Sequence, residues 1–306
     1  MKGRFTVLGT SSAIPTKERN HPAVYLQYGP TALLFDCGEG TQRQIQKAEL
    51  SFFKIDHIFI THLHGDHTLG LPGLLQTLDF HEKEKVSLFG PPGLKKLVEL
   101  STRECFFVST GGLEVEVKEF EPSDEPFEVL RTESFTVRAV GLDHTVPCLG
   151  YSFEEPPKFK FDKELVKRLG LRAHHFKELE KKGETAVGGR VYRKEELGTL
   201  RRGFKWCYLT DTYYTENLFK LTEGADFVVL ECTYLDEEET AKEVKHLTLK
   251  TFAEKVYPVF REQGVKTVVL THFSRRYKDL KPFEEAIKRY GLEGVVLAKD
   301  LLTFEF

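Results

Sequence analysis

The chain has 306 residues, with 44 Lys and Arg against 47 Asp and Glu, and is long enough to bury a sizeable core without disulfides or a structural metal. No apolar run approaches the ~20 residues of a membrane span, and the N-terminus lacks a signal-peptide hydrophobic stretch, so neither a membrane protein nor a secreted one is expected. The five cysteines are scattered without a C-x-x-C pair, which is typical of reduced thiols in a cytoplasmic protein.

Short runs of β-branched and aromatic residues dominate the first third of the chain and predict strands over 5–8, 23–28, 31–35 and 55–61. Helical periodicity predicts helices over 40–48, 69–80, 93–105, 248–262 and 282–290. Further strands are predicted over 86–89, 113–120, 135–140, 149–153, 206–209, 227–230 and 267–270. Strands that first follow one another and later alternate with helices indicate an α/β fold in which helices cover the faces of sheets.

One stretch departs from this alternation. Residues 158–202 contain 14 Lys and Arg against 7 Asp and Glu, a net charge of +7, whereas the rest of the chain carries −10. Two short polar helices are predicted within it, over 162–169 and 174–182, and Gly188-Gly189 predicts a turn. Because it has few consecutive apolar residues, we expect it to lack a core of its own and to be a projecting insertion or a mobile loop.

The densest group of ligand-type residues is the segment Thr61-His62-Leu63-His64-Gly65-Asp66-His67, which directly follows a predicted apolar strand. Three imidazoles and a carboxylate this close together can converge on a metal ion, because a tight turn after a strand aims alternate side chains inward. Imidazole and carboxylate together suit zinc and similar transition ions. The alternative is a polar surface loop, but four ligand-type residues around a glycine hinge favour a metal site.

Three further candidate ligands, His144, Asp211 and His272, also follow predicted strands. Sites in α/β layer folds gather at the carboxyl ends of strands, so these residues together describe one edge of a sheet. The remaining histidines, apart from His246, are expected to be structural, surface or solvated: His21, His57, His81, His174 and His175.

Longer strings in the chain carry a resemblance to a known family. They include Phe35-Asp36-Cys37-Gly38-Glu39-Gly40-Thr41-Gln42, Glu231-Cys232-Thr233, His246-Leu247-Thr248 and His272-Phe273-Ser274-Arg275-Arg276-Tyr277. The H-x-H-x-D-H motif alone identifies only the metallo-β-lactamase fold superfamily. In ordered combination with these strings, it resembles ribonuclease Z, the tRNA 3′-processing endonuclease family. The resemblance covers about residues 5–300 and implies a metallo-β-lactamase-like four-layer αβ/βα sandwich with a projecting basic arm.

The resemblance implies two Zn²⁺ per chain. One ion would be held by His62, His64 and His144. The other would be held by Asp66, His67 and His272, with Asp211 bridging the two. Seven ligands are too many for one tetrahedral zinc and fit a two-metal site, which activates a water and neutralises charge on the attacking and leaving oxygens of a phosphodiester.

The resemblance also assigns catalytic roles. Asp66 would act as a proton acceptor as well as a ligand, His246 would protonate the leaving 3′-oxygen, and Glu231 would orient the ring of His246. A histidine needs such a partner to fix its tautomer and raise its pKa for general-acid work. The alternative for His246 is an ordinary residue at a helix N-terminus. The chain departs from the family at Thr210, where glycine is common before the bridging Asp, and it lacks the Gly-Pro element of the family's arm.

These features predict a single domain over 1–306 with an inserted basic arm over 156–204 that binds tRNA. The expected activity is cleavage of precursor tRNA at the 3′ side of the discriminator nucleotide, giving a tRNA 3′-hydroxyl and a 5′-phosphorylated trailer. A cytoplasmic homodimer is expected by resemblance. Two alternatives stay open: a small-molecule ester or phosphodiester hydrolase of the same fold, which would not need a basic projection, and a catalytically silent RNA-binding protein.

Overall fold

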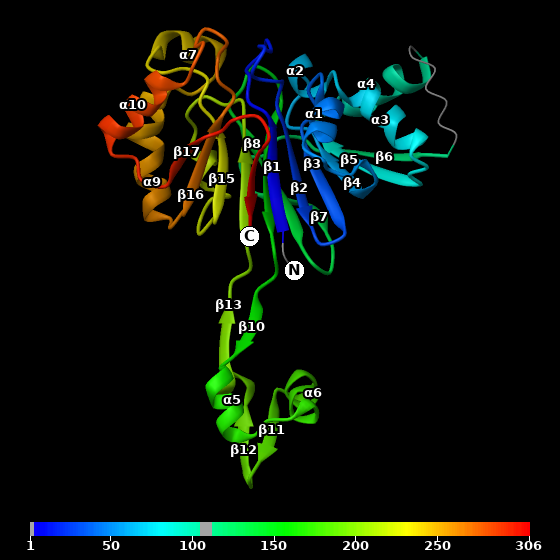
Figure 1. Cartoon of the computed structure of the whole chain (residues 1–306), viewed down its shortest axis with the longest axis vertical. Helices are drawn as coiled ribbons and strands as arrows, with labels where there is room; N and C mark the ends of the chain where they lie inside the picture. The colour runs from blue at the N-terminus through cyan, green and yellow to red at the C-terminus, as the bar shows by residue number, and fades with distance from the viewer. Residues whose placement is uncertain (1–2, 105–111) are drawn as a thin grey trace. The chain divides into compact units, whose positions relative to one another are not determined.

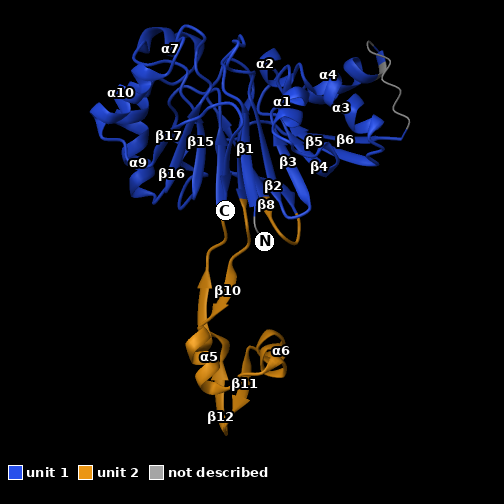
Figure 2. Ribbon diagram, in the orientation of Figure 1, with its two compact units in different colours: residues 1–131, 137–153, 205–306 blue, residues 132–136, 154–204 orange. Residues whose placement is uncertain are grey.

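The computed structural model describes residues 3–104 and 112–306, and the chain divides into two compact units (Figure 2). The first unit comprises residues 1–131, 137–153 and 205–306, and the second comprises 132–136 and 154–204. Among the described residues, no helix is long and apolar enough to cross a membrane.

Two mixed sheets form the first unit (Figure 1). In one sheet the strand order is β18 (Leu302–Glu305), β1 (Gly3–Gly9), β2 (Ala23–Tyr28), β3 (Thr31–Phe35), β4 (Ile55–Phe59), β5 (Lys85–Gly90) and β6 (Glu114–Glu119). In the other the order is β17 (Val295–Leu297), β16 (Thr267–Thr271), β15 (Phe227–Glu231), β14 (Lys205–Leu209), β9 (Cys148–Glu154), β8 (Thr136–Leu142) and β7 (Phe127–Arg131). Strands β3 to β6 and β14 to β17 are parallel within their sheets, so the carboxyl ends of each set lie at one edge.

Aromatic side chains fill the space between the two sheets. The ring of Phe35 on β3 lies 4.7 Å, centroid to centroid, from the indole of Trp206 on β14, and Phe5 on β1 lies 5.7 Å from the same indole. All three side chains are fully buried. Large rings bury much apolar area at small entropic cost, so this layer stabilises the pairing of the sheets.

Helices cover the outer face of each sheet. Helices α1 (Thr41–Lys47), α3 (Leu71–Phe80) and α4 (Leu94–Glu99) share an apolar core with the first sheet. Helices α8 (Leu249–Thr251), α9 (Tyr257–Glu262) and α10 (Lys281–Tyr290) share another with the second sheet. The layers therefore run helix, sheet, sheet, helix (Figure 1), and the predicted four-layer α/β sandwich is confirmed.

Most predicted elements are present with small changes at their ends. The predicted strand over 55–61 ends at Phe59, and the backbone N–H and hydroxyl of Thr61 instead donate to the Asp36 carboxylate. The predicted helix over 248–262 is interrupted by a π-helical turn over Phe252–Val256. This turn ends two residues before Pro258, whose missing N–H disturbs regular α-helical bonding. The helix predicted over 93–105 is α4 followed by a π-helical turn over Leu100–Glu104, and Cys105 lies outside the described residues.

The second unit contains two short two-stranded sheets and two helices. Its elements are β10 (Lys158–Phe161), α5 (Lys163–Leu169), α6 (Ala173–Lys182), β11 (Glu184–Val187), β12 (Arg190–Arg193) and β13 (Gly198–Arg201). Asp162 caps α5 by accepting bonds from two backbone N–H groups. Gly188 and Gly189 both have positive φ, as a tight hairpin turn between β11 and β12 requires.

The second unit also has a small core, so the expectation that this stretch could not form one is wrong. Leu179 of α6 and Leu197 are fully buried, and the ring of Phe161 packs edge-on against that of Phe176 with centroids 5.0 Å apart. These apolar residues are far apart in the sequence, so no continuous apolar segment predicts the core. They converge because the two strand pairs bring the ends of the stretch together.

Candidate metal centre

The predicted site residues come together at the carboxyl ends of strands in the first unit. His62 and the short helix α2 (Gly65–Thr68) follow β4, and His144 follows β8. Asp211 follows β14 and His272 follows β16, while Glu231 is the last residue of β15. The structure therefore brings together the candidate side chains from both sheets at one edge.

The first group of ligand-type atoms consists of His62, His64, His144 and Asp211. Nδ1 of His64 lies 3.1 Å from Nε2 of His62 and 3.2 Å from Nε2 of His144. Oδ2 of Asp211 lies 3.4 Å from Nε2 of His62. Three imidazole nitrogens and one carboxylate oxygen around a common point match the ligands and coordination number of a tetrahedral zinc.

The second group consists of Asp66, His67, Asp211 and His272. Nε2 of His67 lies 3.5 Å from Oδ2 of Asp66 and 3.4 Å from Oδ2 of Asp211. Nε2 of His272 lies 3.6 Å from Oδ2 of Asp66 and 3.1 Å from Oδ1 of Asp211. Asp211 belongs to both groups, which is the arrangement of a bridging carboxylate.

Two buried nitrogen atoms fit a metal at this place. Nε2 of His67 and Nε2 of His272 are buried, and neither has a hydrogen-bond partner among the described residues. Unsatisfied buried polar atoms are uncommon in folded proteins, and a bound ion is one of the explanations for them. Both atoms point at the same carboxylates, so a cation between them would satisfy all four groups.

The electrostatics also suit metal binding. Burial, reinforced by the neighbouring His67, holds the pKa of His62 well below its usual value, so this ring is neutral. Burial opposes ionisation of Asp211, but the neighbouring rings of His272 and His67 outweigh it and hold the pKa of Asp211 well below its usual value. Neutral imidazole and ionised carboxylate are the forms that coordinate metals.

Asp36 is a buried carboxylate next to the ligand groups, and the sequence pattern alone assigned it no role. Its buried Oδ2 lies 2.7 Å from Nδ1 of His67 and accepts a hydrogen bond from the hydroxyl of Tyr208 at 3.0 Å. A carboxylate in this position fixes the tautomer and orientation of a metal-binding histidine. The signal in the sequence is a lone acidic residue directly after the apolar strand β3.

Three of these carboxylate and imidazole residues have strained backbones. Asp36, Asp211 and His272 have φ of 57°, 56° and 63°, in the left-handed region that non-glycine residues seldom adopt. Asp36 and His272 directly follow a strand, and Asp211 follows one by two residues. Such strain clusters at functional sites, where the surrounding structure holds a side chain in a required direction.

The buried Glu231 and the partly buried His246 form a pair next to these two groups and, with His272, make a third group of ligand-type atoms. Nδ1 of His246 lies 2.8 Å from Oε1 of Glu231. Glu231 is fully buried and also accepts hydrogen bonds from the backbone N–H groups of Thr212 and Thr233. Burial disfavours the charged ring of His246, but the Glu231 carboxylate outweighs it and raises the pKa of His246 to about 9.

The pair is adjacent to both ligand groups. The centroid of the His246 ring lies 5.2 Å from that of His144 and 5.3 Å from that of His272. Thr233 connects Glu231 to the ligands, because its hydroxyl donates to Oε2 of Glu231 and lies 2.9 Å from Nδ1 of His272. The charged ring of His246 therefore lies directly next to a histidine of each group.

The other histidines differ in their surroundings. The buried ring of His21 lies 3.2 Å from the carbonyl oxygen of Ala13 through Nε2, and His81 stacks on Phe52. His174 is exposed, with its ring next to that of His175. None of them belongs to a group of ligand-type atoms found among the described residues.

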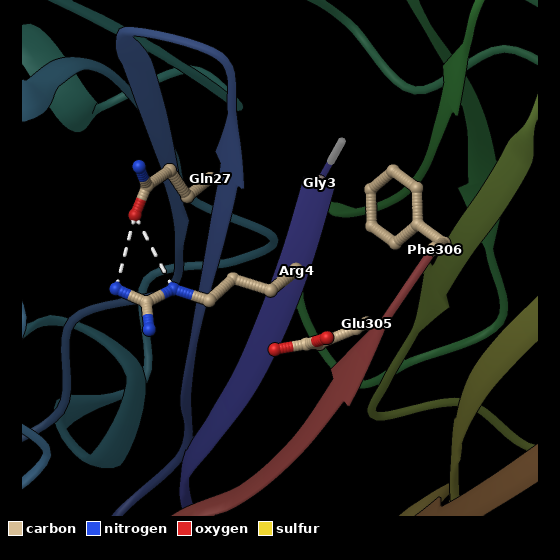
Figure 3. Close-up of a pocket in the computed structure, with 5 residues that line it drawn as sticks. All are labelled: Gly3, Arg4, Gln27, Glu305 and Phe306. Atoms are coloured by element: carbon tan, nitrogen blue, oxygen red, sulfur yellow. Dashed lines mark hydrogen bonds between the residues drawn. The ribbon is translucent and has the colours of Figure 1, made fainter. Parts of the chain in front are cut away.

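A separate pocket lies at the opposite ends of the strands (Figure 3). It has a volume of about 490 Å³ and is lined by Gly3, Arg4, Gln27, Glu305 and Phe306. The guanidinium of Arg4 donates to the Gln27 side chain there. The pocket contains no histidine and a single carboxylate side chain, so it offers no comparable ligand set.

Comparisons with known proteins place the chain in a family. A family model described as "Anti-Pycsar protein Apyc1" matches residues 3–106 only. Ribonuclease Z from Methanothermobacter thermautotrophicus is 39% identical over 304 residues, covering 98% of this chain and 95% of the relative.

Solved structures agree with this relationship. The human short form of tRNase Z is 29% identical with a TM-score of 0.65, covering 98% of both chains. The metallo-β-lactamase fold protein YhfI from Bacillus subtilis is 17% identical with a TM-score of 0.67, covers both chains fully and supports the fold alone. With near-complete coverage by a curated relative, and with two ligand groups sharing Asp211 on this fold, the chain belongs to the ribonuclease Z family.

Proposed function

We propose that the chain is a metal-dependent endoribonuclease that cleaves precursor tRNA at the 3′ side of the discriminator nucleotide. The products are a tRNA with a 3′-hydroxyl and a trailer with a 5′-phosphate. The observation that supports this most strongly is the pair of ligand groups sharing Asp211, with Glu231 and His246 next to them, in a chain of the ribonuclease Z family.

The proposed cofactors are two Zn²⁺. One would be held by His62, His64 and His144, the other by Asp66, His67 and His272, and both by Asp211. When bound, such ions acidify a water molecule and neutralise negative charge that develops on phosphodiester oxygens. The unpartnered Nε2 atoms of His67 and His272 support this assignment.

The two carboxylate oxygens of Asp66 are proposed to have different roles, one in metal binding and the other in proton transfer. Oδ2 faces the ligand nitrogens of His67 and His272 and accepts a hydrogen bond from the backbone N–H of Ala13 at 2.9 Å. That bond fixes the rotation of the carboxyl group. Oδ1 is left to accept the proton of the attacking water.

His246 is proposed as the general acid. Because Nδ1 is held by Glu231, the proton for the leaving 3′-oxygen comes from Nε2. Glu231 keeps the ring charged and fixes its orientation, and its own position is fixed by the N–H groups of Thr212 and Thr233.

The second unit is proposed to be the tRNA-binding arm, inserted in one catalytic domain over 1–306. Residues 158–202 carry a net charge of +7 in a chain whose remainder carries −10. A polyanionic RNA binds such a surface with release of counterions. A small-molecule hydrolase would have no use for it.

Two further properties are proposed on the family resemblance. We expect a homodimer, which analytical ultracentrifugation of the full chain will test. We also expect a cytoplasmic location, supported by four buried free thiols among the described residues: Cys37, Cys148, Cys207 and Cys232.

The activity is tested by incubating the zinc-loaded chain with a radiolabelled precursor tRNA, with and without a chelator. We expect cleavage that stops on chelation and returns with added zinc. Hydrolysis of small esters without cleavage of precursor tRNA would instead support the small-molecule hydrolase.

A further inference from the structure

We propose that Thr210 is a positioning residue that sets the orientation of the shared carboxylate of Asp211 and thereby the affinity of the site for metal. The inference rests on the two-metal site of the proposed function. It is carried by one hydrogen bond: the Thr210 hydroxyl donates to Oδ1 of Asp211 at 2.9 Å.

The two oxygens of Asp211 have different neighbours. Oδ1 lies 3.1 Å from Nε2 of His272, on the side of the second ligand group. Oδ2 lies 3.4 Å from Nε2 of both His62 and His67. A bridging carboxylate must present one oxygen to each ion, so its rotation about the Cβ–Cγ bond decides whether both ions can be held.

Contacts other than the Thr210 hydroxyl hold the backbone around Asp211 in place. The thiol of Cys148 lies 3.6 Å from the carbonyl oxygens of both Thr210 and Asp211, and the N–H of Thr212 donates to Glu231. These contacts fix the main chain at the strained residue Asp211, whose φ is 56°. They leave the rotation of its carboxyl group to side-chain contacts.

Thr210 can orient the Asp211 carboxylate because its side chain has few rotamers and is shielded from solvent. Its side chain is fully buried, so the hydroxyl does not exchange its partner for bulk water. As a β-branched residue it has few rotamers, which keeps the hydroxyl aimed at Oδ1. Oδ1 can accept this hydrogen bond with one lone pair and face the second ligand group with the other. The hydroxyl thereby restricts rotation of the carboxyl group about the Cβ–Cγ bond.

Removing a residue that hydrogen-bonds to a metal ligand lowers metal affinity by about 10–100-fold in characterised metal sites. The bond is made to Oδ1, so the ion of the Asp66, His67 and His272 group is the one expected to weaken more.

The experiment compares Thr210→Val, which keeps the shape and loses the hydroxyl, with Thr210→Ser, which keeps the hydroxyl. Zinc dissociation constants are measured by competition with a chelator of known affinity, and Co²⁺-substituted protein reports ligand geometry through its visible absorption. The matched control is Thr222→Val, which removes another fully buried threonine hydroxyl, bonded to Gln263 outside the site.

We expect Thr210→Val to weaken binding of one zinc ion by about 10–100-fold and to change the Co²⁺ spectrum, with Thr210→Ser and Thr222→Val close to wild type. Thermal unfolding of the metal-free proteins shows that the variants fold. If the valine variant does not fold, Thr210→Ala removes the hydroxyl without placing an apolar methyl group beside the Asp211 carboxylate.

Wild-type zinc affinity and an unchanged Co²⁺ spectrum in folded Thr210→Val protein would overturn the inference. Equal losses in the valine and serine variants would do the same, because they would show that packing rather than the hydroxyl matters. Precursor-tRNA cleavage by the wild-type chain is assayed separately. Its absence would refute the proposed function and leave the metal-affinity result standing.

Discussion

The fully buried carboxylate of Glu231 lies 2.8 Å from Nδ1 of His246 and accepts hydrogen bonds from the backbone N–H groups of Thr212, after β14, and Thr233, after β15. In the proposed mechanism this contact leaves only Nε2 of His246 to act on a substrate, so proton transfer and metal binding would involve different residues. The separation can be tested by substitution.

His246→Ala should lower the rate of the chemical step by about 10²–10⁴-fold, the usual contribution of a general acid. Zinc content and affinity for precursor tRNA should stay near wild type. Single-turnover cleavage and elemental analysis measure the two properties. Since His246, Glu231 and His272 lie close enough to form a third ligand group, loss of zinc together with activity would show that His246 is a ligand.

Asp211→Ala should reduce zinc at both positions, because both ligand groups share this carboxylate. His144→Ala should affect mainly the ion bound by His62 and His64. Elemental analysis and titration with zinc give the stoichiometry, which should be about two ions per wild-type chain at saturation. One ion per wild-type chain at saturation would contradict the two-metal assignment.

Asp36→Asn should weaken binding of the ion held by His67 by about 10–100-fold, because both oxygens of Asp36 accept hydrogen bonds and the NH₂ group of an amide would face a donor in place of one of them. Chelator competition measures the change. Asp226→Asn is the control, since Asp226 is a largely buried carboxylate just before β15, at the strand end opposite Glu231. If the two variants behave alike, Asp36 has no special relation to the metal.

Reversing three exposed charges of the second unit, Lys167, Lys181 and Lys182 to Glu, should weaken precursor-tRNA binding and flatten its salt dependence. Each lost phosphate contact removes roughly 0.7–0.9 from the slope of log affinity against log salt. Filter binding over a series of salt concentrations measures both quantities, and hydrolysis of a nitrophenyl phosphodiester should be retained.

The matched control reverses three exposed charges of α10, Lys281, Lys288 and Arg289. This control changes the total charge by the same amount, so it separates a local binding surface from a general charge effect. Equal salt slopes in the two triple variants would contradict the assignment of the second unit as the tRNA-binding arm.

Much of this arrangement is readable from the sequence, because the chemistry sits at the ends of strongly patterned strands. Apolar runs predict β14, β15 and β16, which are parallel neighbours in one sheet, so the polar residues that follow them, Asp211 and His272 among them, share one edge. His62 follows β4 of the other sheet, and its approach to Asp211 depends on how the two sheets pack.

Other features depend on contacts that no local pattern reveals. The role of Asp36 arises from its pairing with His67, 31 residues away, and the bond from Thr210 depends on the strained backbone of Asp211. Helix α7 (Glu238–Val244) is too polar to show an apolar face, and β18 is a short edge strand. The core of the second unit likewise depends on residues that become neighbours only on folding.

The most direct test of the account is to map the ends of the RNA produced by the zinc-loaded chain from a precursor tRNA with a 3′ trailer. The account predicts one cut, leaving a tRNA that ends at the discriminator nucleotide with a 3′-hydroxyl and a trailer that begins with a 5′-phosphate. A tRNA product ending in a 3′-phosphate, or cuts at unrelated positions, would contradict it, because His246 is placed here as the donor to a leaving 3′-oxygen.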